Sequence, residues 1–133
     1  MGINFMRTIK NPAQEKDALV FDTALLRRYT VLAINPGSTS TKIAVYNGDE
    51  VLVELTLRHS AEELARFNSP IEQFEWRKEL ILNSLAENNF DINDLSAVIG
   101  RGGLLHPIES GVYEVNQTMI DELTHTKSQH ASN

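Results

Sequence analysis

Three strand-forming runs follow one another between residues 29 and 57, with only short turns between them. The first, residues 29–34 (YTVLAI), is almost continuously apolar, and the next two, 41–46 (TKIAVY) and 50–57 (EVLVELTL), alternate in part. Such runs are typical of buried and half-buried β-strands. The Asn-Gly pair at 47–48 indicates a hairpin, because both residues tolerate a positive φ. The segment therefore predicts an antiparallel three-stranded meander.

After residue 57 the hydrophobic pattern takes the period of helices. Ser60 and Glu63 have the spacing of a capping box and predict a short helix through about Phe67. Ser69-Pro70 predicts the start of a longer helix that ends at Asn88-Asn89. The apolar face of that helix is expected to hold Ile71, Phe74, Ile81, Leu82 and Leu85.

Two more strands and a last helix are expected in the remainder of the chain. Residues 94–99 (DLSAVI) lead into a buried strand that ends at Gly100, and 111–115 (GVYEV) predicts a short strand. Asn116 or Thr118 is placed to cap the last helix. The order β-β-β-α-α-β-β-α predicts an α/β fold with a mixed sheet flanked by helices.

Length and composition exclude several classes of protein. A chain of 133 residues has room for one ordinary domain and not for a large two-domain enzyme with a closing cleft. The net charge of -6 argues against a general nucleic-acid binder and against binding to an anionic membrane. The absence of cysteine excludes disulfides, thiolate metal sites and cysteine nucleophiles. No apolar run is long enough to span a membrane or to form a signal peptide, so a cytoplasmic protein is expected.

Residues 1–28 differ in composition from the rest of the chain. They carry five Lys and Arg against three Asp and Glu, whereas the remainder carries seven against fifteen. Asn11-Pro12 interrupts any helix early in this leader, and residues 16–28 have the apolar content of a short helix. The sequence leaves open whether the leader is an ordered appendage or disordered.

The turn between the first two strands, Asn35-Pro36-Gly37-Ser38-Thr39-Ser40, is the strongest candidate site. A tight turn exposes backbone N–H groups, and here hydroxyl side chains and Lys42 surround them. Main-chain donors, hydroxyls and one cation can together bind a phosphate. The turn is not a Walker A loop, which needs two glycines and a following helix. The same residues also suit an ordinary polar hairpin turn, so both interpretations stay open at this point.

A second candidate is the glycine-rich segment Gly100-Arg101-Gly102-Gly103 directly after a predicted strand. A ligand can approach the backbone closely where side chains are missing. Arg101 is expected at the carboxyl end of the strand, where open α/β sheets bind ligands, and its guanidinium suits a carboxylate or phosphate. The alternative is a plain glycine turn with a solvated arginine.

The remaining polar residues indicate no further site. The spacing of His59, His106, His125 and His130 matches no usual zinc arrangement, so surface or packing roles are expected. The acidic residues offer no convincing catalytic pair and suit solvated helix faces. Trp76 is expected to pack between helix and sheet, as is Phe74.

Several separated motifs in one order resemble a known family. They are INPGSTSTK between two strands, LRHS at 57–60, FEWRK at 74–78, AVIGRGGLL at 97–105 and HASN at 130–133. Together they closely resemble the start of butyrate kinase, a family placed with acetate kinase in the actin, sugar-kinase and heat-shock-protein superfamily. The resemblance covers about residues 29–133 and not the leader.

This resemblance implies a ribonuclease-H-like, actin-like first lobe, in which three antiparallel strands precede parallel strands with helices. The implied reaction transfers a phosphoryl group between ATP and a short-chain carboxylate such as butyrate, using Mg²⁺, and gives an acyl phosphate and ADP. The implied partners are therefore small molecules, not nucleic acid or membrane. A homo-oligomer formed through an exposed surface of the lobe is a further expectation.

The resemblance also assigns roles to individual residues. Asn35 matches the asparagine near the transferred phosphoryl group, and Arg101 matches the arginine that binds the substrate carboxylate and offsets transition-state charge. His130 resembles the histidine near the carboxylate pocket, beside which Gly102 and Gly103 are placed. The residues that match the first phosphate loop are Gly37, Ser38, Thr39, Ser40 and Lys42.

The chain also departs from the family. Full-length members are more than twice as long, so residues 29–133 are interpreted as an N-terminal lobe truncated at its C-terminal end. The second phosphate loop, its catalytic acid and the adenosine pocket are missing, and a single wall cannot exclude water. The chain alone is therefore expected to be inactive. Two alternatives stay open: an acetate-kinase-type or other short-chain acid kinase, and a non-catalytic phosphate-binding or interaction module.

Overall fold

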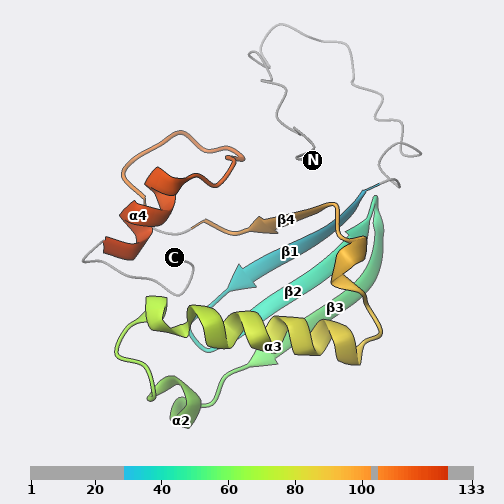
Figure 1. Ribbon diagram of the computed structural model, residues 1–133, viewed down its shortest axis with the longest axis horizontal. Helices are drawn as coiled ribbons and strands as arrows, with labels where there is room; N and C mark the ends of the chain where they lie inside the picture. The colour runs from blue at the N-terminus through green and yellow to red at the C-terminus, as the bar shows by residue number, and fades with distance from the viewer. Residues whose placement is uncertain (1–28, 103–104, 126–133) are drawn as a thin grey trace, which may run out of the picture.

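The computed structural model describes residues 29–102 and 105–125. Predictions about the leader, Gly103 and His130 lie outside these ranges. The strands are β1 (Thr30–Pro36), β2 (Ser40–Asn47), β3 (Glu50–Arg58) and β4 (Ala97–Gly100). The helices are α2 (Ala61–Leu64), α3 (Phe74–Glu87) and α4 (Gln117–His125), with short 3₁₀ turns η1 (Pro70–Gln73) and η2 (Ile92–Asp94). Figure 1 shows α3 lying across one face of the sheet and α4 standing apart from it, beyond β4.

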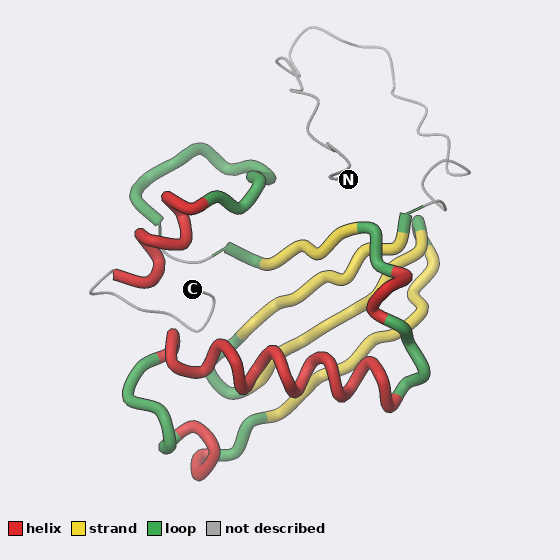
Figure 2. The backbone as a smooth tube through the Cα atoms, in the orientation of Figure 1, coloured by secondary structure: helices red, strands yellow, loops and turns green. Residues whose placement is uncertain are grey.

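The four strands form one mixed sheet in the order β3-β2-β1-β4. β1 pairs antiparallel with β2, and β2 pairs antiparallel with β3, so the predicted meander is confirmed. The second hairpin lies one residue later than the Asn-Gly signal predicts, because Asn47 is still paired with Glu50 and the turn is made by Gly48 and Asp49. Gly48 takes a φ of 63°, whereas Asn47 does not have a positive φ. β4 returns to pair parallel with β1 after the helical crossover, which confirms the mixed α/β sheet (Figure 2).

The hydrophobic core lies between α3 and the meander. Val45 of β2 and Leu85 of α3 are completely buried, and full burial of such a side chain contributes about 1.5–3 kcal/mol. The core cluster consists of Leu32, Ile43, Val45, Val53, Ile81 and Leu85. Because side chains alternate across a strand, every second residue of β1, β2 and β3 turns away from this core.

The predicted apolar face of the long helix is only partly correct. Ile81 and Leu85 are buried, but Leu82 is 37% and Phe74 60% exposed. The buried row of α3 is instead Arg77, Ile81 and Leu85, spaced four residues apart. Leu82 lies about 100° around the helix from Ile81, outside the narrow stripe that reaches the sheet.

The helix ends follow local sequence signals. Ser60 and Glu63 form the predicted capping box, although α2 ends at Leu64 instead of continuing to about Phe67. Pro70 starts a 3₁₀ turn before α3. Asn88 caps α3, and Asn89 then takes a φ of 57°. Asn116 accepts a hydrogen bond at its Oδ1 from the Met119 N–H and so caps α4.

Two expectations about the last strands are wrong. All four residues of β4 are exposed, although a buried strand was expected. Val98 pairs with the buried Leu32 and therefore lies on the α3 side, yet it remains 59% exposed because α3 does not reach this edge. Residues 111–115 form no strand, since no described strand pairs with them. In the described part of the chain, the expected flanking by helices is also found on one face of the sheet alone. Of the described helices, α3 is the one that packs on the sheet (Figure 1).

Among the described helices, none has the length and apolar character needed to cross a membrane.

Candidate functional site

The turn between β1 and β2 exposes free backbone donors. Its ends are joined by a hydrogen bond of 2.7 Å from the Gly37 N–H to the Ser40 carbonyl. A Cβ at Gly37 would lie 3.2 Å from that carbonyl oxygen, so glycine suits this close approach. Ser38 and Thr39 are exposed at the tip, and within the described chain their N–H groups find no acceptor. Two adjacent amides and their hydroxyls are thus available to an anion.

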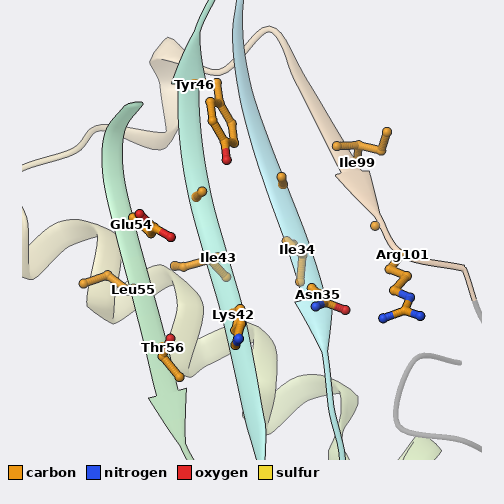
Figure 3. Close-up of a pocket in the computed structure, with 13 residues that line it drawn as sticks. Ile34, Asn35, Lys42, Ile43, Tyr46, Glu54, Leu55, Thr56, Ile99 and Arg101 are labelled. Carbon is orange, nitrogen blue, oxygen red and sulfur yellow. The ribbon is translucent and has the colours of Figure 1, made fainter. Parts of the chain in front are cut away.

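The strand register brings the predicted charged residues together. Lys42 is paired with Asn35 on β1 and with Thr56 on β3. Arg101 follows β4 and continues the parallel ladder, since its N–H donates to the Ile34 carbonyl at 2.9 Å. Paired residues share a face, so Asn35, Lys42 and Thr56 form a row across the face opposite α3, and Arg101 extends it (Figure 3).

A concave surface of about 450 Å³ lies over this row. One end, next to the β1–β2 turn, is polar and holds Asn35, Lys42, Thr56 and Arg101. The lining residues are Ala33, Ile34, Asn35, Lys42, Ile43, Ala44, Tyr46, Glu54, Leu55, Thr56, Ile99, Gly100 and Arg101. The two cations at one end suit a compact ligand with an anionic head, and Ala33, Ala44 and Ile99 give apolar surface beyond them, while Tyr46 and the carboxylate of Glu54 line the same surface further from the row (Figure 3).

Gly100 and Gly102 flank Arg101 on the uncovered side of the sheet. A Cβ at either glycine would meet no atom within 4 Å, so packing within the described chain does not require glycine there. Arg101 itself is exposed. The structure thus leaves free space around the guanidinium at the end of β4.

A buried polar cluster lies directly behind the turn. Two of its residues stand in the LRHS and FEWRK motifs, but the sequence predicts no role in a site for either of them. Thr41, His59 and Arg77 are only 1%, 6% and 8% exposed. Arg77 donates from Nη1 to Thr41 Oγ1 at 2.7 Å and from Nη2 to the Gly37 carbonyl at 2.9 Å. His59 Nε2 lies 2.9 Å from Thr41 Oγ1 and 3.2 Å from Arg77 Nη1. Thr41 therefore points into the core, unlike the three hydroxyl residues before it.

The environment of the cluster favours a neutral histidine beside a charged arginine. Burial, and then the charge of Arg77, lower the pKa of His59, while Glu63 acts in the opposite direction. Burial also lowers the pKa of Arg77, which still keeps its proton because guanidinium is a very weak acid. The Nδ1 of His59 is buried and has no partner among the described atoms.

The other aromatic and histidine side chains have structural environments. Trp76 packs at a tilt on His59, with ring centroids 4.9 Å apart, and on Phe67, both of which follow β3, whereas Phe74, for which packing on the sheet is also expected, is 60% exposed. His106 pairs with Glu122 through Nδ1 at 2.6 Å, and the Nδ1 of His125 hydrogen-bonds to the Asp121 carbonyl of its own helix. In the described ranges no three acidic or histidine side chains gather to bind a metal.

Comparison with known proteins identifies relatives of this chain. No family model matches the chain. Over 106 residues, 79% of this chain, it is 53% identical to butyrate kinase 1 of Clostridium acetobutylicum. It is 54% identical over the same length to a probable butyrate kinase of Clostridium botulinum, and 51% identical to one of Listeria monocytogenes. This chain is a homologue of the butyrate kinases.

The resemblance carried by the separated sequence motifs is thereby confirmed. The chain spans 30% of the length of the butyrate kinases that it matches.

Proposed function

We propose that residues 29–133 form a ribonuclease-H-like lobe of a butyrate kinase and bind the reacting groups of phosphoryl transfer from ATP to butyrate. The meander followed by a strand parallel to β1 is the order of elements implied for that lobe. The observation that carries the proposal is the row of Asn35, Lys42 and Arg101 next to the free amides of Ser38 and Thr39. The homology to butyrate kinases favours butyrate over acetate as the carboxylate.

The residues of this row suit the demands of phosphoryl transfer. The reaction depends on positioning and on stabilising charge that spreads over the phosphoryl oxygens. In the proposal, the Asn35 amide donates to a phosphoryl oxygen, and Lys42 with the amides of Ser38 and Thr39 holds the adjoining phosphate oxygens. Arg101 donates both arms of its guanidinium to the carboxylate and then to the acyl phosphate. The apolar floor from Ala33, Ala44 and Ile99 leaves space for a short acyl chain.

The use of ATP and Mg²⁺ is proposed because the homologues of this chain are kinases. The free amides and the two cations fit phosphate oxygens, so this chain's own residues bind the phosphate end of ATP in the proposal. The described residues offer no acidic cluster for Mg²⁺, which would therefore be held by the nucleotide phosphates and by other groups. Mg²⁺ supplies charge neutralisation between the phosphates when it is bound.

We further propose that residues 29–133, taken by themselves, bind phosphate without catalysing its transfer. The site lies on an open sheet face, and the relatives are more than three times as long as the matched segment. Phosphoryl transfer in such enzymes needs a second wall that closes over the reactants and excludes water.

The proposal is tested with the full chain and two assays. Titration with inorganic phosphate at constant ionic strength should shift the amide resonances of Ser38 and Thr39, and R101A should weaken this binding. An acyl-phosphate assay with ATP, Mg²⁺ and butyrate should give no turnover above that of R101A. Unchanged resonances at millimolar phosphate would contradict the binding role. Turnover well above R101A would contradict the absence of activity.

A further inference from the structure

The buried cluster behind the turn has no role in the proposed chemistry of the open sheet face. We propose that Arg77 is the positioning residue of the β1–β2 turn, which it holds in its anion-binding shape while placing a buried positive charge beneath it. This inference deepens the phosphate-binding role and rests on it for its functional part. Its structural part, the fixing of the turn, stands on the contacts alone.

All three guanidinium nitrogens of Arg77 make polar contacts. Nε and Nη2 both donate to Gln73 Oε1, at 3.0 and 2.8 Å. The second Nη2 hydrogen reaches the Gly37 carbonyl at 2.9 Å, and Nη1 serves Thr41 Oγ1 at 2.7 Å and His59 Nε2 at 3.2 Å. The guanidinium therefore connects α3 to both ends of the turn, at Gly37 and at Thr41.

Every one of these acceptors is neutral. Arg77 forms no ion pair with any described carboxylate, although it is 8% exposed. Buried charges are ordinarily paired, because desolvation without a counter-charge is costly. The positive charge of Arg77 is hence not neutralised within the described chain, and its field acts on the turn only one hydrogen bond away.

The bond to Gly37 has a direct consequence for the exposed donors. The Gly37 carbonyl and the Ser38 N–H belong to the same peptide unit. A cationic donor on the carbonyl polarises that unit, and polarised hydrogen-bonding groups strengthen one another. The Ser38 N–H, which has no acceptor in the described chain, is thereby made a stronger donor toward an anion.

His59 fixes the remaining part of the turn. The backbone N–H of His59 donates to the Thr39 carbonyl at 2.9 Å, and Nε2 of its ring lies 2.9 Å from Thr41 Oγ1. The carbonyls of Gly37 and Thr39 are thus both held on the inner side by Arg77 and His59. The fixed Gly37 carbonyl orients the Ser38 N–H of the same peptide unit, and the fixed Thr39 carbonyl orients the unit that follows Thr39. The Thr39 N–H lies between these two fixed units, so both amides need little rearrangement when an anion binds, which is the preorganisation that tight anion sites require.

The test uses the ¹⁵N-labelled full chain, with inorganic phosphate as the probe at constant ionic strength. Phosphate affinity is measured from the Ser38 and Thr39 resonances. Hydrogen exchange of the Gly37 and His59 amides reports the turn, and urea unfolding reports the fold. R77M removes the guanidinium and keeps the aliphatic stem. The control K78M removes one positive charge from an exposed position of the same helix.

R77M is expected to weaken phosphate binding about tenfold or more and to speed exchange of both amides about tenfold. R77K keeps the charge without the planar donor set, so it should recover part of the phosphate affinity while exchange stays fast. K78M should leave both readouts within about twofold of wild type. Loss of affinity in K78M equal to that in R77M would overturn the inference, because any charge on α3 would then suffice.

A second pair of variants keeps the test decisive if R77M does not fold. T41V removes the hydroxyl that accepts from Arg77 and keeps the size of the side chain, whereas T41S keeps the hydroxyl. T41V should lower phosphate affinity and speed exchange at Gly37, and T41S should restore both. Equal behaviour of T41V and T41S would overturn the inference. A wild-type chain that binds no phosphate would overturn the proposed function, and the exchange comparison would then still decide whether Arg77 fixes the turn.

Discussion

At the scale of single residues, the site contains one group of side chains that sequence patterns identified and one that they did not. Asn35, Lys42 and Arg101 were identified because turn residues and a cation after a strand are local signals. Arg77 was not, because a lone arginine on a helix is usually solvated. Its burial depends on a contact with Gly37, forty residues earlier in the chain, which no local pattern records.

Ionisation of His59 should make stability depend on pH. Its pKa is lowered in the folded chain, so between the folded value and about 6.5 the unfolded state binds more protons. Stability should therefore be full above about pH 7.5 and fall as the pH drops below about 6.5. The charged groups facing the ring are Arg77 on α3, which strengthens this effect, and Glu63 on α2, which weakens it.

The measurement is urea unfolding of wild type and H59Q between pH 5 and 8. H59Q lacks the titrating ring, so the difference in unfolding free energy between the two proteins should shrink as the pH falls. A difference that is constant over this range would contradict a neutral, buried His59.

Gly37 offers a matched comparison between two glycines. G37A places a Cβ 3.2 Å from the Ser40 carbonyl oxygen and should destabilise the chain by about 1 kcal/mol while disturbing the turn. G102A meets open space and should change the unfolding free energy by less than about 0.5 kcal/mol. Thermal unfolding of both variants checks this, and equal effects would mean that the turn tolerates a Cβ.

At the scale of elements, short-range sequence signals predicted turns and helix ends, but they did not predict the pairing and burial of every strand expected after α3. The second hairpin, the capping box and the end of α3 at Asn88 depend on neighbouring residues, and all three are present, although the hairpin turns at Gly48-Asp49 and not at Asn47-Gly48. The burial of β4 and a strand at 111–115 depend on distant partners, and both expectations are wrong. The apolar, β-branched composition of AVIG describes a strand correctly but does not reveal whether a layer covers it.

The packing of α3 gives a test at this scale. L85A removes a completely buried side chain from the row that faces the sheet and should cost about 2–5 kcal/mol. L82A shortens a side chain that is 37% exposed and should lower the unfolding free energy by less than about 1 kcal/mol. Urea unfolding distinguishes this geometry from the broader apolar face expected from sequence, for which the two costs would be similar.

At the scale of the whole molecule, one face of the sheet is covered and the other carries the site. Alternation along β1, β2 and β3 sends Leu32, Ile43 and Val45 to the α3 side and Asn35 and Lys42 to the opposite side. The same pairing that closes the core therefore aligns the polar row. Arg77 connects the two faces, since it is held in the core and contacts the backbone of the turn at the edge of the site.

Binding at that row should be visible in the stability of the entire chain. A ligand that binds only the folded state stabilises it by about 1.4 kcal/mol at ten times its dissociation constant. The chain has a net charge of -6, so bulk attraction cannot draw phosphate to it. Phosphate also stabilises folded proteins in general because it is excluded from their surface, so the part due to a local site is the part that depends on the residues of that site. Phosphate should raise the unfolding temperature relative to chloride at equal ionic strength.

Two variants separate the local site from general charge. K42A removes a cation from the row beside Asn35 and should abolish most of the phosphate-dependent rise in unfolding temperature. K78A removes an equal charge from the exposed surface of α3, where Lys78 pairs with Glu75 and lies over the ring of Phe74, and should retain the rise. The same rise in K42A and K78A would place phosphate elsewhere on the chain, whereas loss in K42A alone ties the stability of the whole fold to the open face of its sheet.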